Sequence, residues 1–162
     1  MAGMSHFWLI LALVAPLTGQ TPLSLKVFGA VPTPLTLTAQ DLASMPRVKV
    51  TDTAHGQGGV YEGVAMRDVL TKVGVPAGTA IRGAEVAKTV IVTGADGYQA
   101  AFALAEFDPE FTDRVAILAD RRDDAPLPAN AAPLQLVLTG EKRPARWVRQ
   151  VVSIEIRAAG GR

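Results

Sequence analysis

The chain has 162 residues, of which 49% are hydrophobic and 19% are charged, enough apolar material for one folded core and too little charge for a disordered chain. Cysteine is absent, which excludes disulfides, thiolate metal ligands, iron–sulfur clusters and a cysteine nucleophile. The net charge of +1 and the 6% aromatic content exclude the basic, aromatic-rich surface that is typical of nucleic-acid-binding proteins.

The N-terminal region contains an unbroken apolar run, residues 7–17, followed by the small and polar residues 18–21. At a helical rise of about 1.5 Å per residue, this run is too short to cross a bilayer core of about 30 Å. It is typical of the apolar region of a secretory signal peptide. The sequence therefore predicts a signal peptide over residues 1–20 and a mature domain over residues 21–162, periplasmic or secreted and not attached to a membrane. An uncleaved N-terminal anchor is the alternative.

The first half of the mature chain shows two strand patterns and two helix patterns. Residues 23–27 and 47–51 alternate apolar and polar side chains, as half-buried strands do, and another strand is expected after the glycines near position 58. Thr38 is placed to cap a short helix over 39–44, with Asp41 three residues later. Apolar residues at helical spacing predict a second helix over 65–73, which Gly74 ends.

The second half is richer in strands. Residues 89–93 are apolar and β-branched, and the turn 94–97 returns the chain into a strand over 98–102, in which Tyr98 is expected to place its ring in the core. A short helix over 104–111, interrupted at Pro109, follows. Strands over 115–119, 134–138 and 151–156 complete the chain. The sequence therefore predicts a β-rich α+β fold in a single compact domain.

Charge is unevenly distributed along the chain. Residues 101–130 carry seven acids and three bases, a net charge of −4, whereas residues 141–162 carry two acids and six bases, a net charge of +4. The basic end contains a cluster with a tryptophan inside it: Lys142, Arg143, Arg146, Trp147 and Arg149. Such a cluster can bind phosphate or another anion through charge-assisted hydrogen bonds. The alternative is a solvated basic loop that the acidic segment partly neutralises.

His55 is the only histidine in the predicted mature chain, which excludes a metal site built from several histidines. Without a partner, a histidine beside a turn is most simply a loop residue. The glycine-rich segment that begins at His55 does not match a dinucleotide-binding fingerprint, because Tyr61 occupies the place of the third glycine.

Six segments in a fixed order resemble the molybdopterin-binding domain of the sulfite oxidase family. The resemblance extends from about residue 37 to residue 156. It is carried by the segments 61–70, 92–98, 118–121, 126–128, 133–138 and 146–149. It implies a sulfite oxidase-type molybdopterin-binding fold, with a pterin cofactor whose phosphate lies in a basic cleft. The residues that it places at the cofactor are His55, Arg67, Tyr98, Lys142, Arg143, Arg146, Trp147 and Arg149.

The sequence departs from the family at the metal. In the family a cysteine thiolate binds molybdenum, and its counterpart here falls near residues 52–55, where no cysteine occurs. The asparagine–arginine pair that follows that cysteine is replaced by residues 57–59, Gln-Gly-Gly. Asp52 or His55 could serve as a substitute ligand, but a carboxylate or imidazole supports oxygen-atom transfer poorly. We therefore predict no metal ligands in the chain.

Two functions remain open at this stage. The first is a non-catalytic binding module that recognises a small anionic ligand, a pterin cofactor, or a periplasmic redox or protein partner. The second is an active molybdopterin-dependent oxidoreductase with a metal ligand other than cysteine, in which the cofactor carries the redox chemistry.

Overall fold

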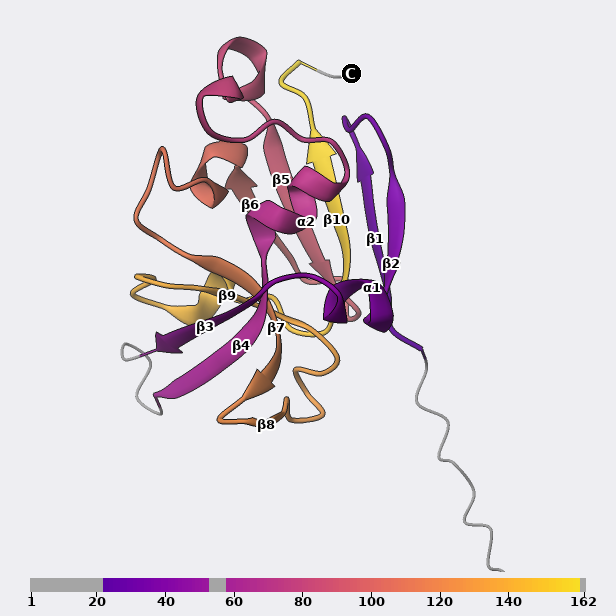
Figure 1. Ribbon diagram of the computed structural model, residues 1–162, viewed down its shortest axis with the longest axis vertical. Helices are drawn as coiled ribbons and strands as arrows, with labels where there is room; N and C mark the ends of the chain where they lie inside the picture. The colour runs from indigo at the N-terminus through magenta and orange to yellow at the C-terminus, as the bar shows by residue number, and fades with distance from the viewer. Residues whose placement is uncertain (1–21, 53–57, 161–162) are drawn as a thin grey trace, which may run out of the picture.

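The computed structural model describes residues 22–52 and 58–160, which form two packed β-sheets (Figure 1). In the order of its strands, sheet A consists of β2 (Leu35–Thr38), β1 (Ser24–Gly29), β10 (Val151–Arg157), β5 (Thr89–Gly94) and β6 (Gln99–Ala103). Sheet B consists of β3 (Arg47–Asp52), β4 (Gly59–Ala65), β7 (Ala116–Arg122) and β8 (Ala125–Pro126), with β9 (Gln135–Leu138) also paired to β7. The predicted β-rich α+β fold in one domain is confirmed.

Strand β1 pairs with β10 in parallel, and every other strand pair is antiparallel. The first strand of sheet A therefore lies beside the last strand of the chain, although more than a hundred residues separate them. Both termini of the described chain consequently belong to the same sheet (Figure 1).

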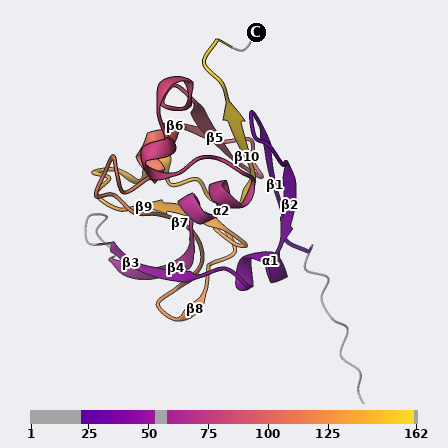
Figure 2. The same cartoon turned by 45° about the horizontal axis from the view of Figure 1, so that its top comes forward.

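Within the described residues, two α-helices accompany the sheets: α1 (Ala39–Ala43) and α2 (Met66–Lys72). Helix α2 lies at the junction of the two sheets in both views (Figures 1 and 2). Its apolar face buries Met66, Val69 and Leu70, as the helical spacing predicts. Gly74 follows the helix with φ +84°, a left-handed conformation that glycine adopts without steric cost.

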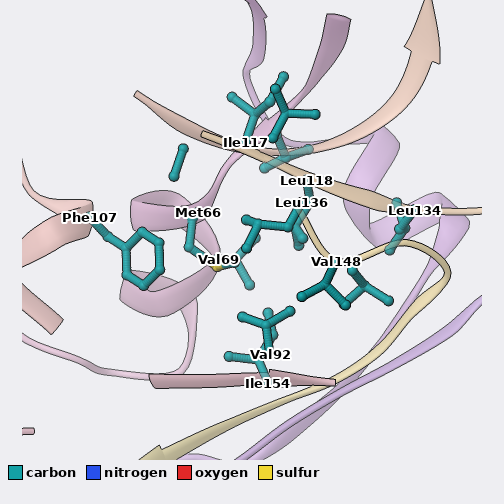
Figure 3. Packing of buried hydrophobic residues seen from close by; sticks show 14 of the residues in the cluster. Met66, Val69, Val92, Phe107, Ile117, Leu118, Leu134, Leu136, Val148 and Ile154 are labelled. Atoms are coloured by element: carbon teal, nitrogen blue, oxygen red, sulfur yellow. The ribbon is translucent and has the colours of Figure 1, made fainter. Parts of the chain in front are cut away.

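The core lies between the inner faces of the two sheets (Figure 3). Sheet A contributes Val92 and Ile154, which face Ile117 and Leu136 of sheet B, and all four side chains are fully buried. Met66 of α2 closes the core at one side. Burying one such side chain contributes about 1.5–3 kcal/mol, so this contact between the sheets contributes substantially to stability.

The expected short helix over 104–111, interrupted at Pro109, is present only in its first part. Only Leu104–Phe107 is helical, as a single 3₁₀ turn, because Asp108 precedes Pro109 and is held in an extended conformation with φ −117° and ψ 131°. The buried carboxylate of Asp108 accepts hydrogen bonds from the backbone N–H groups of Gly78 and Glu110, at 2.7 and 3.0 Å. Asp108 thus anchors an irregular loop rather than a helix.

Other elements agree with the sequence to within a few residues. Strands β2 and β8 were not expected, because each is short and adjoins a proline. Further 3₁₀ turns occur at Gly78–Ala80, Gly83–Glu85 and Pro144–Arg146. None of the helices among residues 22–52 and 58–160 has the length and apolar composition that crossing a membrane requires. The expected signal peptide, residues 1–20, lies outside the described residues.

The capping box of α1 makes a testable contribution to acid stability. The backbone N–H and the hydroxyl of Thr38 donate to the Asp41 carboxylate at 2.8 and 2.7 Å, which lowers the pKa of Asp41 below its ordinary value of 3.8. The unfolded chain therefore binds a proton here more readily than the folded chain does. This stabilisation is complete above the ordinary pKa and is lost as the pH falls through the lowered one. Asp41→Asn should flatten the acid limb of a plot of melting temperature against pH.

Asp113→Asn is the matched control, because Asp113 is exposed and has no hydrogen bond or ion pair with the described residues. The control should keep the acid limb of the wild-type protein. Equal acid limbs in the Asp41→Asn variant and the wild type would contradict the assignment.

Candidate functional site

A cavity of about 220 Å³ opens between the β5–β6 turn and the connection from β9 to β10. We call it the Tyr98 pocket. Its lining residues are Asp96, Tyr98, Gln135, Pro144, Ala145, Trp147 and Arg149. Three of them, Tyr98, Trp147 and Arg149, are among the residues that the sequence places at a ligand.

Tyr98 forms an outer wall of the pocket. Gly97 turns the chain with φ +83°, and the Asp96 carboxylate accepts the backbone N–H of Tyr98 at 2.9 Å. The Tyr98 hydroxyl donates to the carbonyl oxygen of Ala145 at 2.6 Å, which joins the β5–β6 turn to the β9–β10 connection. The expectation that Tyr98 lies in a strand with its ring in the core is therefore wrong: β6 begins at Gln99, and Tyr98 is 50% exposed.

Trp147 forms the inner wall. Its indole N–H donates to the carbonyl oxygen of Leu138 at 3.1 Å, and its ring meets Tyr61 of β4 edge to face, with 5.5 Å between the ring centroids. Burial raises the pKa of the Tyr61 hydroxyl. Trp147 also separates the Tyr98 pocket from a cavity of about 90 Å³, lined by Val50, Thr51, Asp52, Val137, Thr139, Gly140 and Trp147 itself.

Backbone hydrogen bonds on both sides hold Arg149 in place. The Val148 carbonyl oxygen accepts from Leu136 N–H at 2.8 Å, and Val151 N–H donates to Leu134 O at 2.9 Å, so the segment follows β9. A Cβ at Gly94 would lie 2.6 Å from the carbonyl oxygen of Arg149, so glycine is required at this close approach. Arg149 is exposed at the pocket and forms no ion pair with a described carboxylate.

Arg146 lies away from the Tyr98 pocket. Its guanidinium pairs with Glu141 and, at 3.1 Å, with Glu106, and it stands 4.7 Å from the centroid of the Phe102 ring. These carboxylates, Glu141 first, raise the pKa of Arg146. These ion pairs neutralise Arg146. Glu106 belongs to the acidic segment 101–130, so this agrees with the alternative of a basic loop that the acidic segment neutralises.

Three other predicted ligand residues, Arg67, Lys142 and Arg143, do not line the pocket. Arg67 is exposed on α2, with Asp68 at 3.5 Å. Lys142 and Arg143 are exposed and form no ion pair with the described residues. His55 lies outside the described residues. The structure thus brings Tyr98, Trp147 and Arg149 together and leaves Arg67 and Arg146 elsewhere.

Four residues that line the pocket were not predicted from the sequence, and two of them, Asp96 and Gln135, have polar side chains. Gln135 is only 7% exposed, yet its side-chain amide has no hydrogen-bond partner among the described residues. Asp108, the other buried polar residue of the described chain, has its carboxylate fully engaged. The available signal for Gln135 was its position as the one polar residue within the apolar run 134–138.

The side chains do not fit a protein-ligated molybdenum centre. The sequence has no thiol, and no group of three or more histidine or acidic side chains in residues 22–52 and 58–160 is arranged to hold a metal ion. Asp52, at the end of β3, lines the small cavity behind Trp147.

No curated protein matches the sequence. The fold is similar to that in the crystal structure of the sulfane dehydrogenase SoxCD from Paracoccus pantotrophus, with a TM-score of 0.65 and 22% identity over 86% of this chain and 40% of that chain. The chain therefore spans less than half the length of that chain. The model of the oxidoreductase molybdopterin binding domain matches residues 14–160. The chain thus belongs to the oxidoreductase molybdopterin binding domain family, as its resemblance to the sulfite oxidase type of domain predicts.

Proposed function

We propose that the protein is an exported, non-catalytic binding member of this family that holds a small anionic ligand in the Tyr98 pocket. Export is supported by the apolar run over residues 7–17, which is typical of a signal peptide. The loss of catalysis is supported by the absence of cysteine, since no other side chain supplies an equivalent soft anionic ligand for molybdenum.

The observation that carries the ligand proposal is Arg149. Its guanidinium has no described carboxylate partner, although most arginines of this domain have one. It borders a cavity that also has two aromatic walls. Guanidinium forms paired, charge-assisted hydrogen bonds to carboxylates, and such contacts are strong when water is partly excluded.

The pocket is better suited to a small anion than to a complete molybdenum cofactor. Among the described residues that line the pocket, Arg149 is the only cation, and the Asp96 carboxylate lies on the same lining. A doubly charged phosphate would therefore meet one positive and one negative group. Ligand pockets for larger organic molecules usually measure about 300–1,000 Å³, which also favours a smaller guest here.

The first test measures bound molybdenum and pterin. Protein purified from a host that makes molybdopterin should contain neither stoichiometric molybdenum nor stoichiometric pterin, measured by elemental analysis and by pterin fluorescence after acid oxidation. Stoichiometric molybdenum together with pterin would contradict the proposal and support the alternative, an active oxidoreductase with a metal ligand other than cysteine.

The second test is binding of a simple carboxylate. Titration with 3-phenylpropionate, followed by amide NMR shifts, should perturb the residues of the Tyr98 pocket, and Arg149→Ala should weaken this binding about tenfold or more. Arg146→Ala is the matched control, because Arg146 belongs to the same cluster but pairs with Glu106 and Glu141. Equal losses in the two variants, or no binding by the wild type, would overturn the assignment.

A further inference from the structure

We infer that the ligand of the Tyr98 pocket is a small zwitterion, of which a free amino acid is the simplest example. The inference rests on the proposed function in that Arg149 binds the anionic group of the ligand, and it adds a second group: the ligand presents a carboxylate to Arg149 and an ammonium group to Asp96. Nothing in the resemblance to molybdopterin-binding domains implies such a guest.

The pocket offers two opposite charges that do not neutralise each other. Asp96 and Arg149 both line it, yet no ion pair joins them and neither pairs with another described residue. One oxygen of Asp96 accepts the backbone N–H of Tyr98, and the other has no hydrogen bond to the described residues. A ligand with one charge of each sign satisfies both side chains, whereas an anion alone leaves the Asp96 carboxylate beside it.

Gln135 supplies the second, independent observation. The residue is only 7% exposed and lines the pocket, and its side-chain amide has no hydrogen-bond partner among the described residues. Its amide atoms are not among the buried unpaired atoms of the described chain, so the amide opens onto the pocket. A ligand can therefore bind this amide without first displacing a partner within the described chain. The amide has an N–H donor for a carboxylate and an oxygen acceptor for an ammonium group. Gln135 can therefore bind a ligand that carries both a carboxylate and an ammonium group.

The aromatic walls define the rest of the ligand. The Tyr98 ring is fixed by its hydrogen bond to Ala145, and the Trp147 ring by its bond to Leu138 and its contact with Tyr61. Rigid walls of this kind bind an apolar or aromatic side chain with little loss of conformational entropy. An amino acid with an apolar side chain fits this combination of charged and aromatic groups.

The experiment compares three probes that share a phenyl group and a similar chain: L-phenylalanine, 3-phenylpropionate and 2-phenylethylamine. Titration calorimetry on the full chain should show that phenylalanine binds at least about tenfold more tightly than either singly charged probe, because a second charge-assisted hydrogen bond is worth about 1.5–3 kcal/mol. Equal binding of phenylalanine and 3-phenylpropionate would overturn the inference and leave the proposed function standing. Binding of none of the three would overturn both.

Asp96→Asn separates charge from structure, because asparagine keeps the oxygen that accepts the Tyr98 N–H. This variant should lose the preference for phenylalanine and bind 3-phenylpropionate at least as well as the wild type does. A preference for phenylalanine that survives the substitution would contradict the role of Asp96.

Gln135→Met tests the amide with a side chain of similar length. If the amide binds a ligand, the variant should bind phenylalanine about tenfold or more weakly, while its urea midpoint changes little because the amide makes no hydrogen bond within the described chain. A lower midpoint with unchanged affinity would show that Gln135 is structural, and would remove this support.

Discussion

Replacement of Gly63 by alanine is expected to lower the free energy of unfolding by about 3 kcal/mol. Gly63 lies in β4 at the irregularity where its register with β7 shifts. A Cβ at this position would be 2.0 Å from the carbonyl oxygen of Leu118 and 2.6 Å from the Cα of Ala119. Both contacts are with backbone atoms of the neighbouring strand, so β4 and β7 must separate to admit the methyl group. Urea unfolding followed by circular dichroism measures the loss.

Gly83→Ala is the control for this prediction. Gly83 has φ +59°, and a Cβ there meets nothing within 4 Å, so only the left-handed backbone conformation is penalised, at about 1–2 kcal/mol. If the Gly63 variant loses no more unfolding free energy than the Gly83 variant, strands β4 and β7 can separate without a cost in stability. Since β4 also carries Tyr61, which packs on Trp147, we expect the Gly63 variant to bind 3-phenylpropionate less tightly as well.

Ile154→Ala should cost about 2–5 kcal/mol of unfolding free energy. Ile154 is fully buried in β10, the middle strand of sheet A, and lies beside Val92 where the two sheets meet (Figure 3). Truncation removes three carbon atoms and leaves a cavity that the strands on both sides prevent from collapsing. The loss is again measured from the urea midpoint, with the dependence of the unfolding free energy on urea concentration unchanged.

Val152→Ala is the matched control, because Val152 belongs to the same strand but is 38% exposed beside a register shift. It should cost less than about 1 kcal/mol. Ile154→Val, which removes a single methylene, should fall between the two variants, at about 0.5–1.5 kcal/mol. Equal losses of unfolding free energy in the three variants would mean that the contact between the sheets contributes little to stability.

The sequence predicts most elements of the fold because hydrophobic periodicity is a local property. Helix α2 and strand β5 follow directly from the spacing of their apolar residues. The helix expected over 104–111 ends at Phe107, before the predicted interruption at Pro109, because the carboxylate of Asp108 helps to fix an extended backbone there. That carboxylate binds Gly78, which is 30 residues away, and no local pattern reports such a contact.

The sequence predicts only part of the candidate site, because contacts between residues that are distant in the sequence decide which side chains reach it. A cluster of cations is visible in sequence, but the direction of each side chain depends on its partners. Arg146 and Arg149 are only three residues apart, yet Glu106 and Glu141 hold the first away from the Tyr98 pocket, and the hydrogen bonds to β9 hold the second at it. The role of Gln135 depends on its position in the pocket and on the lack of a hydrogen-bond partner, which only the three-dimensional structure shows.

The parallel pairing of β1 with β10 has a consequence for biosynthesis. Strand β10 also pairs with β5, so it is the only link between the β1–β2 hairpin and the β5–β6 hairpin within sheet A. A nascent chain that still lacks residues 151–157 holds two separate hairpins, and isolated hairpins are marginally stable in water. The domain must therefore complete its folding after the ribosome has released this strand, and a truncation before Val151 leaves the sheet without its centre.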